Sequence, residues 1–296
     1  MYPKFLPTTV GQLTEAASIA LAQSIEQIAI TTPLSTQPIA TTYVHQGSGS
    51  TPFLLIHGFD SSVLEYRRLQ PLLATHNETW AVDLLGFGFT ERPAGIKLNT
   101  TDIKTHLYGF WKTLINQPVI LVGASMGGAA AIDFTLTYPE VVQKLVLIDS
   151  AGLTGSSPFG KFIFPPLDYL ATEFLRNPKV RQQISRAAYK NKQLATIDAQ
   201  LCAALHLEAS SWSKGLIAFT KSGGYTAFKF KKLAEIQQPT LILWGDSDRI
   251  LGTKDAPRFK RAIPNSQLIW IKDCGHVPHL EQPQITAQHI LQFLIK

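Results

Sequence analysis

Residues 118–138 read PVILVGASMGGAAAIDFTLTY, an uncharged apolar run followed by G-A-S-M-G-G and an alanine-rich segment. This order predicts a β-strand, a very tight turn and an α-helix, with Ser125 at the apex of the turn. Such a turn needs little or no side chain two residues before and after its apex, and Gly123 and Gly127 meet that requirement. The pattern favours a nucleophile elbow, which holds a reactive serine clear of the backbone. A glycine-rich turn without a chemical role is the alternative.

The rest of the chain alternates between short apolar runs and segments of helical character. The apolar runs predict strands at 51–58, 79–83, 118–123, 144–149, 239–245 and 266–273. Helices are predicted at 63–74, 99–115, 126–137, 254–262 and 283–295, with Asn99 or Thr100 as a cap. Runs that are apolar throughout are typical of strands covered on both faces. The alternation therefore predicts an α/β fold with a mostly parallel, doubly wound sheet. The segment 31–47, interrupted by two prolines, suits edge strands.

One connection is much longer than a crossover helix requires. Residues 151–235 separate two predicted strands and contain their own helical patches at 167–175, 180–189, 196–207 and 213–221. We interpret this segment as a helical insertion, called the lid below, in a core formed by residues 1–150 and 236–296. Residues 1–38 are expected to form an N-terminal helical extension of the core. It would include an amphipathic helix over 13–30 that lies on the core or on a membrane.

The positive charge of the chain is concentrated in the lid. The net charge is +6; the lid holds twelve Lys or Arg and five Asp or Glu, which gives +7 and leaves −1 for the rest. A basic face suits an anionic substrate or peripheral contact with an anionic membrane surface, although an ordinary solvated face has the same composition. Nucleic-acid binding is disfavoured, because no basic and aromatic stripe or recognised module accompanies the charge. The lid's apolar residues are expected to face the sheet as a pocket wall: Phe159, Phe162, Phe164, Leu167, Leu170, Phe174 and Leu175.

Composition narrows the class of protein further. With 45% hydrophobic and 16% charged residues, the chain has the composition of a globular protein. Cys202 and Cys274 are far apart and lack metal-ligand spacing, which favours a reducing compartment over a disulfide framework. No secretory signal and no apolar run of roughly 20 residues is visible, so we expect a soluble, cytoplasmic protein. We expect no metal and no cofactor, because neither a ligand cluster nor a dinucleotide-binding glycine pattern is present.

A serine at an elbow needs a base to take its proton and an acid to orient that base. In an open α/β sheet these partners should follow other strands at their carboxyl ends. Asp248 follows one predicted strand in W-G-D-S-D-R, and His276 follows the next in D-C-G-H-V-P-H. We therefore predict Ser125 as nucleophile, His276 as base and Asp248 as acid. The backbone amides of Phe59 and Met126 are the predicted oxyanion hole.

The predicted roles have competing candidates. Asp246 stands directly at a strand end, where we expect it to brace the loop, and Asp149 is a second alternative acid. His57, in H-G-F-D, is expected to hold its loop by hydrogen bonds. His279, three residues after His276, is expected at the surface.

Five motifs, taken in order, resemble those of the α/β-hydrolase fold family: H-G-F-D (57–60), D-L-L-G-F-G (83–88), G-A-S-M-G-G (123–128), W-G-D-S-D (244–248) and G-H-V-P-H-L-E-Q-P (275–283). H-G-F-D-S-S together with D-L-L-G-F-G-F-T is similar to cyanobacterial and chloroplast members, among them the chlorophyll dephytylase and pheophytinase branch. The resemblance implies an α/β-hydrolase fold and a serine hydrolase that cleaves a carboxylic ester of a lipophilic small molecule or lipid.

The resemblance also separates this chain from some relatives. Epoxide hydrolases and haloalkane dehalogenases of this fold carry an aspartate at the elbow, where this chain has Ser125. The elbow of prolyl iminopeptidases resembles G-G-S-W-G, and this chain departs from that motif at Met126. The elbow of carbon–carbon bond hydrolases resembles S-M-G-G, as in this chain, so this activity stays an alternative to ester hydrolysis. A ligand-binding protein or receptor that keeps the triad with little turnover is another. The lid matches no pattern that names a substrate.

Overall fold

The computed structural model describes residues 1–49, 51–154 and 165–295. It contains an eight-stranded sheet with the order β1-β2-β4-β3-β5-β6-β7-β8. The pairs β1–β2 and β2–β4 are antiparallel, and the other neighbouring pairs are parallel. The mostly parallel α/β sheet expected from the sequence is therefore confirmed. Its strands are β1 (Ile25–Ile30), β2 (Ile39–Gln46), β3 (Phe53–Ile56), β4 (Thr79–Val82), β5 (Val119–Ala124), β6 (Val142–Ile148), β7 (Thr240–Gly245) and β8 (Ser266–Ile271).

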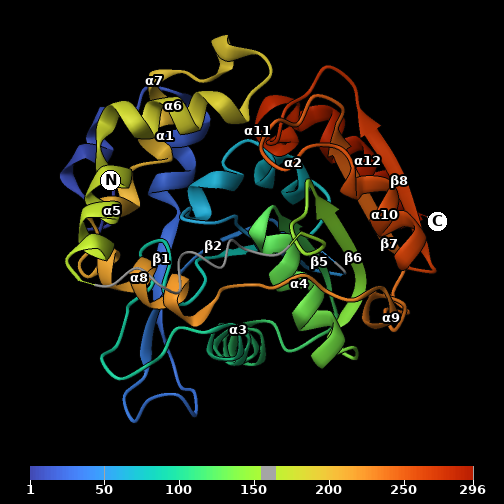
Figure 1. Ribbon diagram of the computed structural model, residues 1–296, viewed down its shortest axis with the longest axis horizontal. Coiled ribbons are helices and arrows are strands. Elements are labelled where there is room, and N and C mark those ends of the chain that lie inside the picture. Colours follow the sequence, from blue (N-terminus) through green and yellow to red (C-terminus); the bar gives the residue numbers. More distant parts are fainter. Residues whose placement is uncertain (50, 155–164, 296) are drawn as a thin grey trace.

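Helices cover both faces of the sheet (Figure 1). On one face, α3 (Thr100–Leu114), α4 (Met126–Thr137) and α10 (Asp255–Ala262) contribute to one hydrophobic core. On the other, α1 (Ala16–Gln23), α2 (Gln70–Ala74) and α12 (Pro283–Ile295) contribute to a second. Every residue of β3, β4, β5 and β7 is buried, which explains why these strands are apolar throughout.

Local sequence signals set several helix bounds. The Asn99 side chain accepts a hydrogen bond from the Asp102 amide at 2.9 Å, so the expected cap of α3 is confirmed. The helix predicted over 63–74 is instead split into a 3-10 helix, η2 (Val63–Tyr66), and α2. Pro71 lies in the first turn of α2, where its missing N–H prevents one continuous helix from running through it.

The helix expected over residues 13–30 is wrong in its second half. Only Ala16–Gln23 is helical, and Ile25–Ile30 forms β1 at the edge of the sheet. β2 offers a free row of backbone groups there, and pairing with it buries Ile25 and Ile30. Tertiary pairing therefore overrides the helical character of the segment, and residues 1–38 are not a purely helical extension.

The segment between β6 and β7 is the helical insertion that the sequence predicts. Its elements are α5 (Leu167–Arg176), α6 (Pro178–Ala188), the 3-10 helix η4 (Lys192–Leu194), α7 (Ile197–Cys202), the 3-10 helix η5 (Leu205–Glu208), α8 (Trp212–Ser222) and α9 (Phe230–Leu233). Helix α5 packs against both α6 and α8. The division between core and lid at residues 151 and 235 stays a prediction. Among the described residues, no helix is both long and apolar enough to cross a membrane.

Candidate active site

Ser125 occupies the apex of the turn between β5 and α4, with φ 52° and ψ −120°. This left-handed φ is unusual for a residue with a side chain, and the surrounding packing must hold it in place. A Cβ at Gly123 would lie 2.3 Å from the Gly127 carbonyl oxygen, and one at Gly127 would lie 2.2 Å from the Ile56 carbonyl oxygen. Both positions therefore require glycine, as the sequence analysis expected.

The structure brings Ser125, His276 and Asp248 together at the carboxyl ends of three strands. His276 Nε2 lies 3.0 Å from Ser125 Oγ, and His276 Nδ1 lies 2.9 Å from Asp248 Oδ2. An ionised Asp248 can only accept from Nδ1–H, which leaves Nε2 free to accept the serine proton. Burial raises the pKa of Asp248, but the hydrogen bond and charge of His276 outweigh it and lower that pKa overall. The arrangement can convert the Ser125 hydroxyl into a nucleophile.

The rival acid Asp149 lies in the same cluster. One oxygen of Asp149, one of Asp248 and one ring nitrogen of His276 lie within 4.8 Å of one another. Burial, together with the nearby charge of Asp248, raises the pKa of Asp149 well above its usual value. The pKa of Asp149 is raised and that of Asp248 is lowered, and these opposite directions favour Asp248 as the charged partner of the imidazole. Asp246 is exposed and accepts a hydrogen bond from the neighbouring Ser247.

Two other histidines lie near the site, and the sequence prediction is right for one of them and wrong for the other. His57 is fully buried; its Nδ1 donates to the Gly58 carbonyl at 2.8 Å and its Nε2 accepts from the Leu84 amide at 3.1 Å. Its expected role in holding the loop is confirmed. The expectation that His279 is a surface residue is wrong, because all four residues of α11 (Pro278–Glu281) are buried. His279 Nε2 lies 3.2 Å from Glu65 Oε1.

The loop after β3 passes directly against Ser125. A Cβ at Gly58 would lie 3.3 Å from Ser125 Cβ, and the Gly58 amide donates to Glu65 Oε2 at 2.9 Å. In the described part of the chain, neither the Phe59 amide nor the Met126 amide donates a hydrogen bond. Both amides are therefore unpaired, which the predicted oxyanion hole requires. Sequence reasoning missed Glu65, which fixes this loop; it carries no motif of its own.

We expect Glu65→Gln to be less stable than the wild type at pH 7, by about 3 kcal/mol. Burial raises the pKa of Glu65, but the adjacent His279, together with His57 and Ser61, outweighs burial and lowers that pKa from 4.5 to about 2. The carboxylate therefore stabilises the fold above pH 4.5, and this contribution is lost as the pH falls through about 2. Urea unfolding should measure the difference in free energy of unfolding between the wild type and Glu65→Gln. This difference at pH 3 should be less than half of its value at pH 7.

The surface variant Glu140→Gln is the control for this measurement and should match the wild type throughout. A destabilisation of Glu65→Gln that stays constant from pH 7 to pH 3 would show that Glu65 stabilises the loop by its shape rather than by its charge.

Ser125 lines a cavity of about 270 Å³ between the core and lid helices α6 and α7. The lid contributes apolar and weakly polar side chains, and the core contributes Ser125, His276 and a buried arginine. The lining includes Arg67, Ser125, Ile184, Tyr189, Cys202 and His276. The lid also touches the triad directly, because the Ala188 carbonyl accepts a hydrogen bond from the His276 amide at 2.7 Å.

A single carboxylate, Asp60, ties the loop after β3 to three lid elements. It pairs with Arg181 of α6, and its Oδ1 lies 3.1 Å from His206 Nε2 of η5. The same oxygen accepts from Trp212 Nε1 of α8 at 2.7 Å. Asp60 is 7% exposed. Burial raises its pKa, but the contacts with His206, Arg181 and Trp212 lower it far below its usual value. Sequence reasoning missed this link, for which the acidic fourth residue of H-G-F-D was the available signal.

We expect Asp60→Ala to lower the free energy of unfolding by roughly 3–5 kcal/mol, because it leaves Arg181 and His206 without their buried acidic partner. Limited proteolysis should then cut the lid before the core. The matched control is Asp273→Ala, which removes the exposed partner of Lys190 and should leave both readouts unchanged. A lid that stays resistant to protease in Asp60→Ala would contradict this role for Asp60.

Helix α5 presents polar side chains to the protein and apolar side chains to solvent. Asp168 and Thr172 are buried, whereas Leu167, Leu170 and Phe174 are 62%, 61% and 64% exposed. An amphipathic helix on a soluble protein normally has the opposite orientation. The expectation that these three apolar residues face the sheet is therefore wrong.

The physical reason is an ion pair inside the lid. Asp168 Oδ2 accepts from Lys221 Nζ of α8 at 2.6 Å, and this contact turns the polar face of α5 inward. Leu175 does pack against the core, as expected. Phe159, Phe162 and Phe164 lie outside the described residues.

Comparison with known proteins identifies the class. Residues 51–283 match the family model described as alpha/beta hydrolase fold, so the chain belongs to the α/β-hydrolase fold family and is a hydrolase of that fold. It is 32% identical to the alpha/beta hydrolase domain-containing protein VTE7 of Arabidopsis thaliana over 99% of this chain and 90% of that protein. It is 28% identical to 2-hydroxy-6-oxo-2,4-heptadienoate hydrolase of Pseudomonas putida over 86% of this chain and 92% of that protein.

A solved structure gives the same assignment. A serine hydrolase involved in carbazole degradation, the CarC enzyme, superposes with a TM-score of 0.76 at 26% identity, over 92% of this chain and 99% of that one. Other matches are named as lipases, esterases and meta-cleavage product hydrolases.

Proposed function

We propose that the protein is a carboxylic ester hydrolase that acts on a lipophilic small molecule or lipid through an acyl-enzyme intermediate. The observation that carries the proposal is the chain of contacts from Ser125 Oγ to His276 Nε2 at 3.0 Å and from His276 Nδ1 to Asp248 at 2.9 Å, at the mouth of a cavity. Glycine at positions 123 and 127 makes this arrangement possible, because the elbow has no room for side chains there.

The proposed reaction begins when Ser125 Oγ attacks the ester carbonyl carbon and His276 Nε2 takes the hydroxyl proton. The amides of Phe59 and Met126 hold the negative oxygen of the tetrahedral intermediate, and Asp248 stabilises the imidazolium. When the intermediate collapses, the bond to the alcohol breaks and the alcohol leaves with the proton from His276. Water, deprotonated by His276, then attacks the acyl group, and Ser125 is released as its proton returns. These steps use protein groups and water alone.

The lipophilic substrate is supported by the walls of the site. Ile184, Ile250, Val277 and Leu280 line the cavity together with Ser125 and His276, and apolar walls with a few polar groups are typical of sites for apolar ligands. Lipase 1 of Psychrobacter immobilis, 26% identical over 85% of this chain, is a relative whose name supports ester cleavage.

Two other functions compete with this proposal. The relative named 2-hydroxy-6-oxo-2,4-heptadienoate hydrolase favours carbon–carbon bond hydrolysis, which a serine triad can also serve. A ligand-binding protein with little turnover would keep the same residues but release no product.

A substrate panel separates these functions. We expect the wild type to release p-nitrophenol from p-nitrophenyl esters of several acyl lengths and to leave a 2-hydroxy-6-oxo-dienoate intact. Cleavage of the dienoate with no ester turnover would reassign the protein to the carbon–carbon bond hydrolases. Saturable ligand binding that survives Ser125→Ala, with no turnover of either substrate class, would favour a receptor.

We also propose that the protein is cytoplasmic and that its lid contacts an anionic membrane surface. Leu167, Leu170 and Phe174 form one exposed stripe of α5. Helix α6, which packs against α5 (Figure 1), carries the exposed basic residues Lys179 and Arg186. Apolar side chains flanked by cations match the boundary between acyl chains and anionic headgroups. Both cysteines are unpaired, in keeping with a reducing compartment.

Vesicle sedimentation tests the membrane contact. We expect the wild type to sediment with vesicles of phosphatidylcholine and phosphatidylglycerol at low salt, and less with phosphatidylcholine alone. Phe174→Asp should lose this binding, whereas Ile285→Asp, at an exposed position of α12, should keep it. Equal binding by both variants would reject the contact. A concentration-dependent dimer that Phe174→Asp abolishes would mean that a second copy covers the stripe instead.

A further inference from the structure

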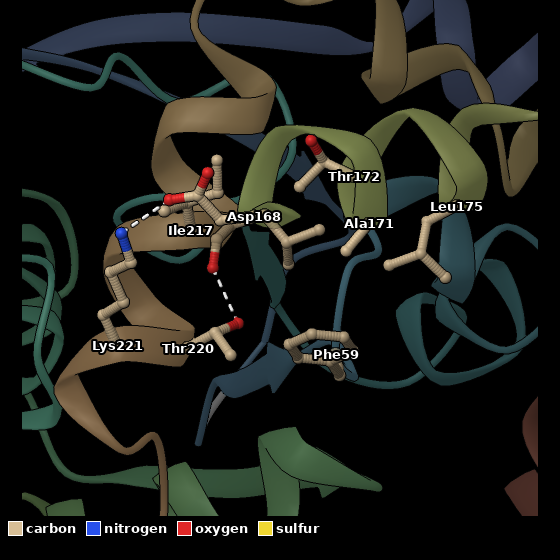
Figure 2. A pocket seen from close by; sticks show the side chains of 9 residues that line it. Phe59, Asp168, Ala171, Thr172, Leu175, Ile217, Thr220 and Lys221 are labelled. Carbon is tan, nitrogen blue, oxygen red and sulfur yellow. Dashed lines mark hydrogen bonds and ion pairs between the residues drawn. The ribbon is translucent and has the colours of Figure 1, made fainter. Parts of the chain in front are cut away.

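A second cavity, of about 250 Å³, lies between lid helices and shares Phe59 in its lining with the cavity that Ser125 lines. Figure 2 shows α5 and α8 facing each other across it, with the Phe59 ring at its base. Its apolar lining consists of Phe59, Ala171, Leu175, Leu216 and Ile217. The triad does not reach this cavity, so the mechanism above does not account for it.

The polar side chains in the wall of this second cavity are already paired with other protein groups. Asp168 and Lys221 are joined at 2.6 Å (Figure 2), and Thr220 Oγ1 donates to the Leu216 carbonyl at 2.8 Å. Thr172 Oγ1 donates to the Tyr169 carbonyl at 2.9 Å. A polar ligand would have to compete with these bonds, whereas a hydrocarbon would only displace water from apolar surface. The wall therefore selects an apolar ligand.

Phe59 connects this cavity with the active site. Its ring lines both cavities and is 47% exposed, although the residue belongs to the loop that packs against Ser125. The ring contacts Phe87 and Phe219, each with centroids 6.1 Å away. The Phe59 amide is also a proposed oxyanion donor, so a chain attached to the reacting carbonyl would run along the Phe59 side chain. Each cavity alone is smaller than the roughly 300–1,000 Å³ typical of small-molecule sites, and the two together reach that range.

We propose that the cavity between α5 and α8 binds the distal hydrocarbon chain of the substrate ester, with the Phe59 ring as the divider that the chain passes. The proposal rests on the ester hydrolase function and deepens it, because it names long-chain esters as the substrate class. The hydrocarbon chain can belong to the acid part or to the alcohol part of the ester. An acyl chain and an alkyl chain are chemically alike, so two separate ester series are needed to distinguish them.

The experiment measures kcat/KM for two series of monomeric esters: p-nitrophenyl esters of acids with 2 to 12 carbons, and acetates of alcohols of the same lengths. In one series, each methylene that reaches the cavity should raise kcat/KM by roughly threefold to fourfold. Ala171→Phe, which fills the cavity from α5, should lower kcat/KM for the longest ester of that series by about tenfold or more. It should leave the two-carbon ester within about twofold.

Two further variants make the result specific. Ile217→Ala widens the same cavity from α8 and should shift the preferred length upward. Ala187→Phe places the same bulk on the exposed surface of α6 and should behave like the wild type. If Ala171→Phe misfolds, the shift in preferred ester length in Ile217→Ala still tests whether the cavity binds the hydrocarbon chain. Unchanged length profiles in Ala171→Phe and Ile217→Ala, with full turnover of short esters, would overturn the chain site and leave the hydrolase function intact. If no ester of any length is turned over, the hydrolase function itself fails.

Discussion

Replacing Ser125 with alanine is expected to lower ester turnover by roughly 10⁴-fold to 10⁶-fold, because the reaction loses its nucleophile and no other group can form the acyl-enzyme. The hydroxyl lies 3.0 Å from His276 Nε2, and no other serine has a contact with this nitrogen among the described residues. The variant should fold normally, since alanine removes a single oxygen from a partly exposed position. Single-turnover assays with p-nitrophenyl esters should therefore show no burst of product.

The matched control is Ser185→Ala, which removes a hydroxyl from the wall of the same cavity. Its turnover should stay within about threefold of the wild type, because Ser185 has no part in the proton transfer. If Ser125→Ala kept more than one hundredth of the wild-type rate, the ester cleavage would have to come from another group.

The second large effect is expected at Asp248. Asp248→Asn should lower kcat by about 10⁴-fold, because the amide can donate to Nδ1 and so favours the wrong tautomer of His276. The carboxylate of Asp248 accepts from His276 Nδ1 at 2.9 Å and from the Ile250 amide at 2.7 Å, which fixes its orientation. Asp149→Asn should lower kcat by no more than about tenfold, because burial beside Asp248 raises the pKa of Asp149 and so disfavours its charged form.

The comparison of these two variants decides between the candidate acids. Both substitutions keep the shape of the side chain, so a difference in kcat reports charge and proton position rather than packing. A large loss of kcat in Asp149→Asn with a small loss in Asp248→Asn would assign the role of the acid to Asp149, which follows β6. Equal large losses would mean that the two carboxyl groups titrate as one unit.

The sequence predicted those features that depend on short-range pattern. The elbow at Ser125 was predictable because its backbone geometry excludes side chains at positions 123 and 127. Asp248 and His276 were predictable as partners because parallel strands end at one edge of the sheet, which brings residues distant in the chain together. The bounds of α4 and α12 agree with the predicted helices for a similar reason, since turn and proline signals mark their ends.

The features that the sequence did not reveal depend on contacts between distant segments that no motif and no shared strand end marks. β1 is a strand only because β2 leaves an edge to pair with. His279 is buried because Glu65, far away in the chain, lies 3.2 Å from its ring. α5 faces the protein with Asp168 because Lys221 lies opposite on α8. In each case the outcome depends on a long-range contact, and one sequence contains no signal for such a contact.

The most direct measurement of the central proposal is covalent labelling with a fluorophosphonate, which reacts with an activated serine. Intact-mass and peptide analysis of the wild type should show one phosphonyl group per chain, on Ser125, and Ser125→Ala and His276→Ala should not be labelled. A wild type that stays unlabelled, or a label on any other residue, would contradict the proposed nucleophile.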